Sequence, residues 1–184
     1  SVGCNNTNEE KILVFAAAST SNVIQQLGDN FSKQHGINVK FNFGGSTSLS
    51  SQIIRGAPAD ILITSGDQPM DELERRDLLE PGSRVGLLTN SLALISPLTS
   101  IEALDLKTFL IQSSRIAIAN PSLAPAGIYT QEALKNMGLW DTVLPKLVYG
   151  SNIRTALGYV ASGNVDSGVV YNTDAQIATR KVRI

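Results

Sequence analysis

The sequence predicts an α/β protein with mainly parallel sheets. Short apolar runs alternate along the chain with segments whose apolar residues recur at helical spacing. The first such pair is the run Ile12–Phe15 and a segment in which Val23, Ile24, Leu27 and Phe31 share one face. At four places the turn from a strand into a helix consists of small, uncharged residues. Such alternation favours parallel strands joined by right-handed crossovers, with ligands beyond the carboxyl ends of the strands, at helix N-termini.

The first part of the chain contains three strand–helix units. Strands are expected over 11–15, 37–43 and 60–64, and helices over 19–34, around Leu49, Ile53 and Ile54, and over 69–76. Gly36 should end the first helix and Gly56–Ala57–Pro58 the second. An extended segment over 84–96 follows, and Asn90 and Ser91 lie where a strand could leave one domain for another.

The alternation of strands and helices continues in the second part of the chain. Helices are expected over 101–112, 128–137, 153–162 and 172–179, and strands over 115–119, 146–149, 166–171 and from 182 onward. A loop over 120–127 opens onto the second of these helices, and Gly150–Ser151–Asn152 should cap the third.

Length and composition narrow the possible functions. With 184 residues, 42% hydrophobic and 17% charged, the chain can bury a core in one large domain or two small ones. Its net charge of −1 and the lack of any basic run argue against nucleic acid as the main partner. No apolar run is long enough to span a bilayer.

Cys4 is the single cysteine, so neither an internal disulfide nor a cysteine metal cluster is expected. Small residues precede it, and residues 5–10 form a polar spacer, so residues 1–10 should be a disordered tether. The junction resembles the point at which a bacterial lipoprotein is cleaved and lipidated, although Ser1 stands where a leucine is usual. A lipidated Cys4 and a plain disordered N-terminus remain the two alternatives.

Four residues are expected at or beside helix starts: Ser19, Ser46, Ala126 and Ile153. The first N–H groups of a helix lack partners within it, so four converging helix starts could surround an oxyanion with neutral donors. The alternative is that Ser19 and Ser46 are ordinary N-caps, which is the commoner use of serine there.

Other motifs and residues in the sequence do not indicate a nucleotide, catalytic or metal site. Neither a P-loop nor a dinucleotide-binding glycine motif is present, which argues against nucleotide binding. His35, the only histidine, is expected at a helix end rather than as a base or metal ligand. Tyr171 ends a buried strand, where its hydroxyl either reaches a carbonyl or points into a cleft. A group of acids is better explained by a strand start and a solvated helix start than by a metal: Asp60, Asp67, Asp71 and Glu72.

Four motifs together are specific to one family. Residues 15–19, 56–61, 125–129 and 168–175 read FAAAS, GAPADI, PAGIY and GVVYNTDA. In order and spacing they resemble the molybdate-binding proteins of bacterial molybdate ABC importers, from about Lys11 to Ile184. The resemblance implies a type II periplasmic binding fold, with a ligand cleft between a first lobe at 11–90 and a second lobe at 91–184. Such proteins usually continue through a segment that completes the first lobe, so that part is expected to be missing here.

The resemblance also implies which groups hold the ligand. The contacts would be the hydroxyl and N–H of both serines, two further N–H groups and one phenol: Ser19, Ser46, Ala126, Ile153 and Tyr171. These are seven donors with no lysine or arginine among them, and Gly44–Gly45 replaces a stretch often richer in serine. A donor-only site should reject hydrogen phosphate, whose proton needs an acceptor, and sulfate would have to be excluded by cavity size.

The implied protein is a monomeric binding protein and not an enzyme. It would carry molybdate or tungstate to the membrane permease of an ABC transporter, with no cofactor, no nucleic acid and no metal beyond the oxyanion. Its location would be the periplasm or the cell surface, anchored there if Cys4 is lipidated. The alternatives are a binding protein for another tetrahedral oxyanion such as sulfate, the ligand-sensing domain of a transcription regulator, and an enzyme with a serine nucleophile, for which no partner base is patterned.

Overall fold

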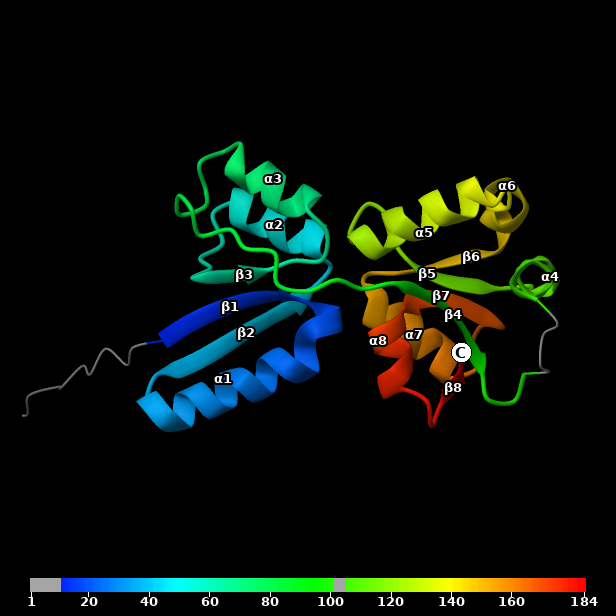
Figure 1. Cartoon of the computed structure of the whole chain (residues 1–184), viewed down its shortest axis with the longest axis horizontal. Helices are drawn as coiled ribbons and strands as arrows, with labels where there is room; N and C mark the ends of the chain where they lie inside the picture. The colour runs from blue at the N-terminus through cyan, green and yellow to red at the C-terminus, as the bar shows by residue number, and fades with distance from the viewer. Residues whose placement is uncertain (1–10, 101–104) are drawn as a thin grey trace, which may run out of the picture.

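The computed structural model describes residues 11–100 and 105–184, which form two lobes, each built on its own sheet (Figure 1). The first sheet has the strand order β2-β1-β3, and the second β6-β5-β7-β4-β8. Cys4, the predicted tether and residues 101–104 lie outside the described residues, and the helix predicted over 101–112 begins at Leu106. Placing the lobe boundary at residues 90 and 91 remains a prediction.

The first lobe consists of a parallel sheet between helices. Its strands are β1 (Lys11–Ala17), β2 (Asn38–Gly44) and β3 (Ile61–Ile63), and both β2 and β3 run parallel to β1. A 3-10 turn over Ala18–Thr20 leads into α1 (Ser21–His35), which ends at Gly36 with a φ of 71°. Figure 1 shows α1 on one face of the sheet, and α2 (Ser46–Ile54) and α3 (Gln68–Glu74) on the other. Because the strands are parallel, their carboxyl ends meet at one edge, which faces the second lobe.

The second lobe has helices on both faces of a mixed sheet. Its strands are β4 (Leu92–Pro97), β5 (Ile116–Ala119), β6 (Leu147–Gly150), β7 (Ser167–Tyr171) and β8 (Val182–Arg183). Its helices are α4 (Leu106–Gln112), α5 (Pro125–Asn136), α6 (Trp140–Val143), α7 (Ile153–Ala161) and α8 (Asn172–Ile177), with a 3-10 turn at Leu144–Lys146. Every residue of β5 is buried, as expected for a central strand covered on both faces.

The predicted extended segment over 84–96 is wrong in length. Only Leu92–Pro97 forms a strand, and residues 84–91 cross between the lobes without helix or strand (Figure 1). The strand β4 runs antiparallel to β7, with Leu92 paired to Tyr171. The chain arrives from the first lobe, so β4 enters the second sheet at the edge where β7 ends. Parallel pairing otherwise holds for β5 with β6 and β7, as predicted.

Two helices differ from the sequence prediction. α5 begins at Pro125 and not at residue 128, because proline is well suited to the first helical position. The short helix α6, which begins at Trp140, was not predicted, and Lys135 Nζ lies 5.9 Å from the centroid of the Trp140 ring.

The apolar face of α1 is largely exposed. None of its residues is buried, and Val23, Leu27 and Phe31 are all exposed among the described residues. The absence of a segment that completes the first lobe remains a prediction. No helix in the described ranges is both long enough and apolar enough to cross a membrane.

Candidate functional site

A small cavity lies between the lobes, at the edge where the strands of the first sheet end. The space between its lining atoms, counted together with the part open to solvent, is only about 220 Å³. It therefore suits one small solute. The lining comes from both lobes and includes no charged residue: Ala17, Ala18, Ser19, Gly44, Gly45, Ser46, Ser65, Ala124, Pro125, Ala126, Asn152, Ile153 and Tyr171.

All five residues predicted as ligand contacts line this cavity. Ser19 lies in the 3-10 turn after β1, and Ser46 is the first residue of α2. From the second lobe, Ala126 is the second residue of α5, Ile153 is the first of α7, and Tyr171 ends β7. The structure thus brings together groups from five segments that are far apart in the sequence.

Three backbone N–H groups at this cavity belong to the first turns of helices. The first four N–H groups of an α-helix have no acceptor within it, which applies to Ser46, Ala126 and Ile153. Asn152 caps α7 as predicted, because its side chain accepts from the N–H of Thr155. The positive ends of the helix dipoles make these positions suitable for an anion.

The alternative interpretation of the two serines as N-caps is wrong. The residues at the N-cap positions of α1 and α2 are Thr20 and Gly45, and neither helix has a side-chain cap. Ser46 is 1% exposed, and its Oγ accepts a hydrogen bond from the N–H of Ser65 at 2.9 Å. Its hydroxyl is therefore held at the cavity by another segment and does not cap its own helix.

Ser65 is a cavity residue that the sequence analysis missed. Its Oγ lies 2.5 Å from the phenol oxygen of Tyr171, across the gap between the lobes. Burial raises the pKa of Tyr171, and the hydrogen bond between its phenol and Ser65 lowers the pKa to a smaller extent. The phenol is therefore protonated at neutral pH and has a hydrogen to donate. Ser65 follows β3, so the rule that ligands gather at carboxyl strand ends could have identified it.

Arg154 crosses between the lobes beside the cavity. Its guanidinium donates to the backbone oxygen of Ser19 at 3.1 Å, and its Nε lies 2.5 Å from Asp174 Oδ1. The two atoms are close enough to form an ion pair. Within the described part of the chain, however, neither atom makes a hydrogen bond of good geometry. Asp174 is fully buried, and burial raises the pKa of its carboxyl although Arg154 opposes the shift. The guanidinium of Arg154 is thus paired with an acid of its own lobe.

The raised pKa of Asp174 makes stability depend on pH in a defined direction. Because its folded-state pKa lies above the ordinary 3.8, ionisation costs the folded protein stability as the pH rises from about 3.8 through the raised pKa. Asp174→Asn cannot ionise, so its free energy of unfolding should improve relative to wild type over that interval. Urea titrations of both proteins across this pH range measure the difference. A difference that does not change with pH would contradict the raised pKa.

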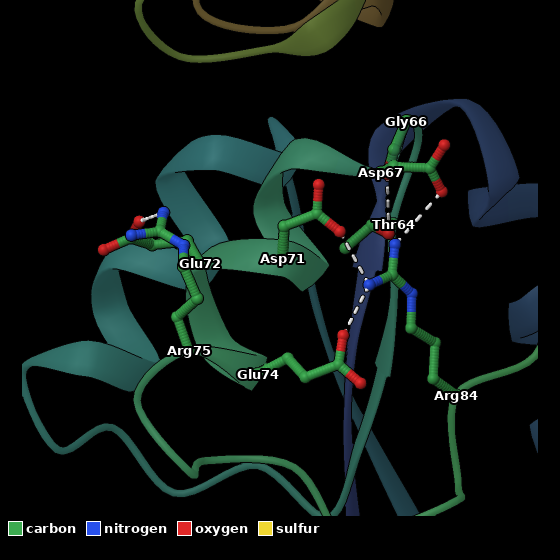
Figure 2. Close-up of polar contacts among 8 residues, drawn as sticks. All are labelled: Thr64, Gly66, Asp67, Asp71, Glu72, Glu74, Arg75 and Arg84. Carbon is green, nitrogen blue, oxygen red and sulfur yellow. Dashed lines mark hydrogen bonds and ion pairs between the residues drawn. The ribbon is translucent and has the colours of Figure 1, made fainter.

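The acids considered as a metal site form ion pairs instead. Arg84 lies among the carboxylates of Asp67, Asp71 and Glu74, with nitrogen–oxygen distances of 3.2, 2.7 and 2.8 Å (Figure 2). Its pKa is raised, chiefly by the hydrogen bond to Asp71. Glu72 pairs with Arg75 and Arg76. Within 11–100 and 105–184, no group of three or more histidine, cysteine or acidic side chains is arranged to hold a metal ion.

The remaining residues singled out in the sequence have structural roles. Asp60 accepts a hydrogen bond from the N–H of Leu13 at 2.7 Å, which attaches the start of β3 to β1. His35 is the last residue of α1, as predicted, and its ring centroid lies 4.4 Å from that of Phe31.

Comparisons with known sequences identify similar proteins. A family described as bacterial extracellular solute-binding proteins matches residues 12–184. The molybdate-binding protein ModA of Escherichia coli is 38% identical over 183 residues, which cover 96% of this chain and 71% of that protein. A putative ABC transporter substrate-binding lipoprotein of Bacillus subtilis is 35% identical, with 97% and 70% covered.

Solved structures agree with the predicted fold. The periplasmic molybdate-binding protein of Azotobacter vinelandii matches with a TM-score of 0.75 and 27% identity, over 87% of this chain and 71% of that one. The sulfate-binding protein SubI of Mycobacterium tuberculosis matches with a TM-score of 0.76 over 95% and 70%, but at 14% identity it supports the fold alone. The predicted two-lobed periplasmic binding fold, with mostly parallel sheets flanked by helices, is confirmed.

Proposed function

Because this chain belongs to the bacterial extracellular solute-binding protein family, we propose that it captures molybdate or tungstate between its lobes and delivers the oxyanion to the permease of an ABC importer. The family is one of binding proteins, not enzymes. The observation that carries the proposal is the shared cavity: the five predicted donor residues, from both lobes, line one small, uncharged space. Sequence relatives named for molybdate binding support this choice of ligand.

The chemistry of the cavity favours a fully deprotonated dianion. Two serine hydroxyls, one phenol and the N–H groups of four residues make seven donors, from Ser19, Ser46, Ala126, Ile153 and Tyr171. Hydrogen phosphate brings a proton that would need an acceptor, and a desolvated hydroxyl without one costs about 1–3 kcal/mol. Helix dipoles stabilise the ligand charge, since the nearby Arg154 is already paired with Asp174. Phosphate should therefore be excluded by its protonation.

The contacts between the lobes suit a binding cycle of closure and release. The N–H of Ser48 donates to the backbone oxygen of Leu123 at 3.2 Å, and Arg154 and Ser65 make the two further bridges. Closure removes water from the cavity and strengthens each donor contact, because the local dielectric falls. Release requires only that the lobes separate again, which is a hinge motion. The permease would drive that step.

Calorimetric titration tests the proposed ligand. Molybdate and tungstate should bind to the whole chain, whereas phosphate and sulfate should not. Ser19→Ala removes one hydroxyl donor to a charged ligand and should weaken molybdate binding by about tenfold, or roughly 1.5 kcal/mol. Ser162→Ala, an exposed serine at the far end of α7, is the control and should bind as wild type does. Tight sulfate binding would favour the sulfate alternative, and no binding of any oxyanion would refute the proposal.

A further inference from the structure

We infer that Ser65 is a positioning and specificity residue, which holds the hydroxyls of Ser46 and Tyr171 so that both donate into the cavity. The inference rests on the proposed oxyanion function and goes beyond it, since Ser65 is not among the predicted donors. The supporting observation is that Ser65 contacts two of the three proposed donor hydroxyls at once, that of Ser46 through its backbone and that of Tyr171 through its side chain.

The backbone of Ser65 sets the direction of the Ser46 hydroxyl. A serine hydroxyl has one hydrogen to donate and two lone pairs with which to accept. The N–H of Ser65 occupies a lone pair of Ser46 Oγ at 2.9 Å. Ser46 is almost fully buried and does not cap its own helix. Its hydrogen is therefore left for a group in the cavity.

The side chain of Ser65 sets the direction of the Tyr171 hydroxyl. The two oxygens are 2.5 Å apart, and either could donate to the other. When an oxyanion without protons occupies the cavity, the single phenol hydrogen of Tyr171 is needed by the ligand. Ser65 must then donate to Tyr171, which gives a chain from Ser65 Oγ–H to the phenol and from the phenol to the anion. Hydrogen bonds in such a chain strengthen one another.

This arrangement also bears on which anion is accepted. With Ser65 donating, a lone pair of the Tyr171 oxygen is occupied, and the phenol acts toward the cavity as a donor. Without the Ser65 hydroxyl, that phenol is free to rotate and to accept. Hydrogen phosphate would then find an acceptor for its proton. Ser65 thus favours the donor role of Tyr171 over its acceptor role, which disfavours protonated oxyanions.

The hydrogen bond between Ser65 and Tyr171 also joins the two lobes. Ser65 lies in the loop after β3 of the first lobe, whereas Tyr171 ends β7 of the second. The chain of donors is therefore complete only when the lobes are closed. In an open protein, Ser65 and Tyr171 would each be free to bond with water, and the selection against protonated anions would be absent.

A double-mutant cycle with calorimetry tests the inference, with molybdate and inorganic phosphate as ligands. Ser65→Ala should weaken molybdate binding by about tenfold and lower the ratio of molybdate to phosphate affinity by more than that. Ser65→Thr keeps the hydroxyl and should restore the ratio. In a Tyr171→Phe background, Ser65→Ala should have almost no further effect on molybdate, because the partner is already gone. Thermal unfolding of each variant confirms that it is folded.

Two results would overturn the inference while leaving the proposed function intact: wild-type affinity and selectivity in Ser65→Ala, or an equal loss of affinity with and without the Tyr171 hydroxyl. The second result would mean that Ser65 only supports the local structure. If the wild-type chain itself fails to bind molybdate, the proposed function fails, and this inference fails with it.

Discussion

Gly45→Ala should weaken molybdate binding by about a hundredfold or more, or roughly 3 kcal/mol, while leaving each lobe folded. A Cβ on Gly45 would lie 2.4 Å from the backbone oxygen of Leu123 and 3.1 Å from that of Ser151. Both oxygens belong to the second lobe, and backbone atoms cannot rotate away as a flexible side chain can. The lobes would have to stand farther apart, which withdraws the donors of the second lobe from a ligand held by the first.

The expected loss comes from this contact and not from backbone strain. Gly45 has φ −70° and ψ 133°, a conformation open to any residue. The glycine is needed here because the chains of the two lobes approach closely. Three donors, from Ala126, Ile153 and Tyr171, lie on the far side of the gap. Each hydrogen bond to a charged group contributes about 1.5–3 kcal/mol, so partial withdrawal of all three accounts for the predicted loss.

Gly158→Ala is the matched control for this experiment. It lies within α7, where an added Cβ meets no atom within 4 Å, and alanine is the better helix former. It should bind molybdate as wild type does and be slightly more stable. Calorimetry gives the affinities, and thermal unfolding gives the stabilities. If Gly45→Ala binds within about threefold of wild type, the close approach of the lobes is not required for binding.

Ser46→Ala should weaken molybdate binding by about a hundredfold, a larger effect than that of Ser19→Ala. The substitution removes a hydroxyl donor to the ligand, worth about 1.5–3 kcal/mol. It also removes the acceptor of the Ser65 N–H, which leaves that N–H without its partner. A buried donor left unpaired costs about 1–3 kcal/mol, and Ser65 will shift to relieve it. Because Ser65 also holds Tyr171, the disturbance should reach the second lobe.

Ser51→Ala, on the same helix, is the control. Its hydroxyl donates to the backbone oxygen of Thr47 at 2.8 Å, inside α2. It does not line the cavity between the lobes. Calorimetric titration of both variants should show near wild-type affinity for Ser51→Ala and a large loss for Ser46→Ala. Equal affinities in the two would remove Ser46 from the proposed site.

Much of the candidate site could be predicted because it is built from local units. Ser46 and Ile153 begin helices as expected, Ser19 lies in the turn before one, and Tyr171 ends a strand. Each of these positions follows from a run of apolar residues, a turn of small residues and a helical pattern, all within about 20 residues. Parallel strands place such turns at one edge of a sheet. The resemblance to a known family then indicated which turns belong together.

The missed features all depend on contacts between distant segments. Ser65 bonds to Ser46 and to Tyr171, which is 106 positions away. Arg154 reaches the backbone of Ser19, 135 positions away, and takes Asp174 as its partner. The position of Ser65 after a strand marks it as a candidate, but no local pattern shows which distant groups Ser65 and Arg154 contact. The antiparallel direction of β4 was missed for the same reason, since it depends on how the chain passes from one lobe to the other.

The sequence alone determined that the chain is α/β, that its strands end in turns of small residues, and that several N–H groups and hydroxyls stand at those turns. These properties are local, because hydrophobic period and turn chemistry act over a few residues. Only the tertiary structure decided that the turns of two lobes meet around one cavity, and that Gly45 lies against the backbone of the second lobe. It also decided that Ser65 joins the hydroxyls of Ser46 and Tyr171. Packing over long sequence separations sets these distances, and a hydrogen bond depends on distances of a few tenths of an ångström.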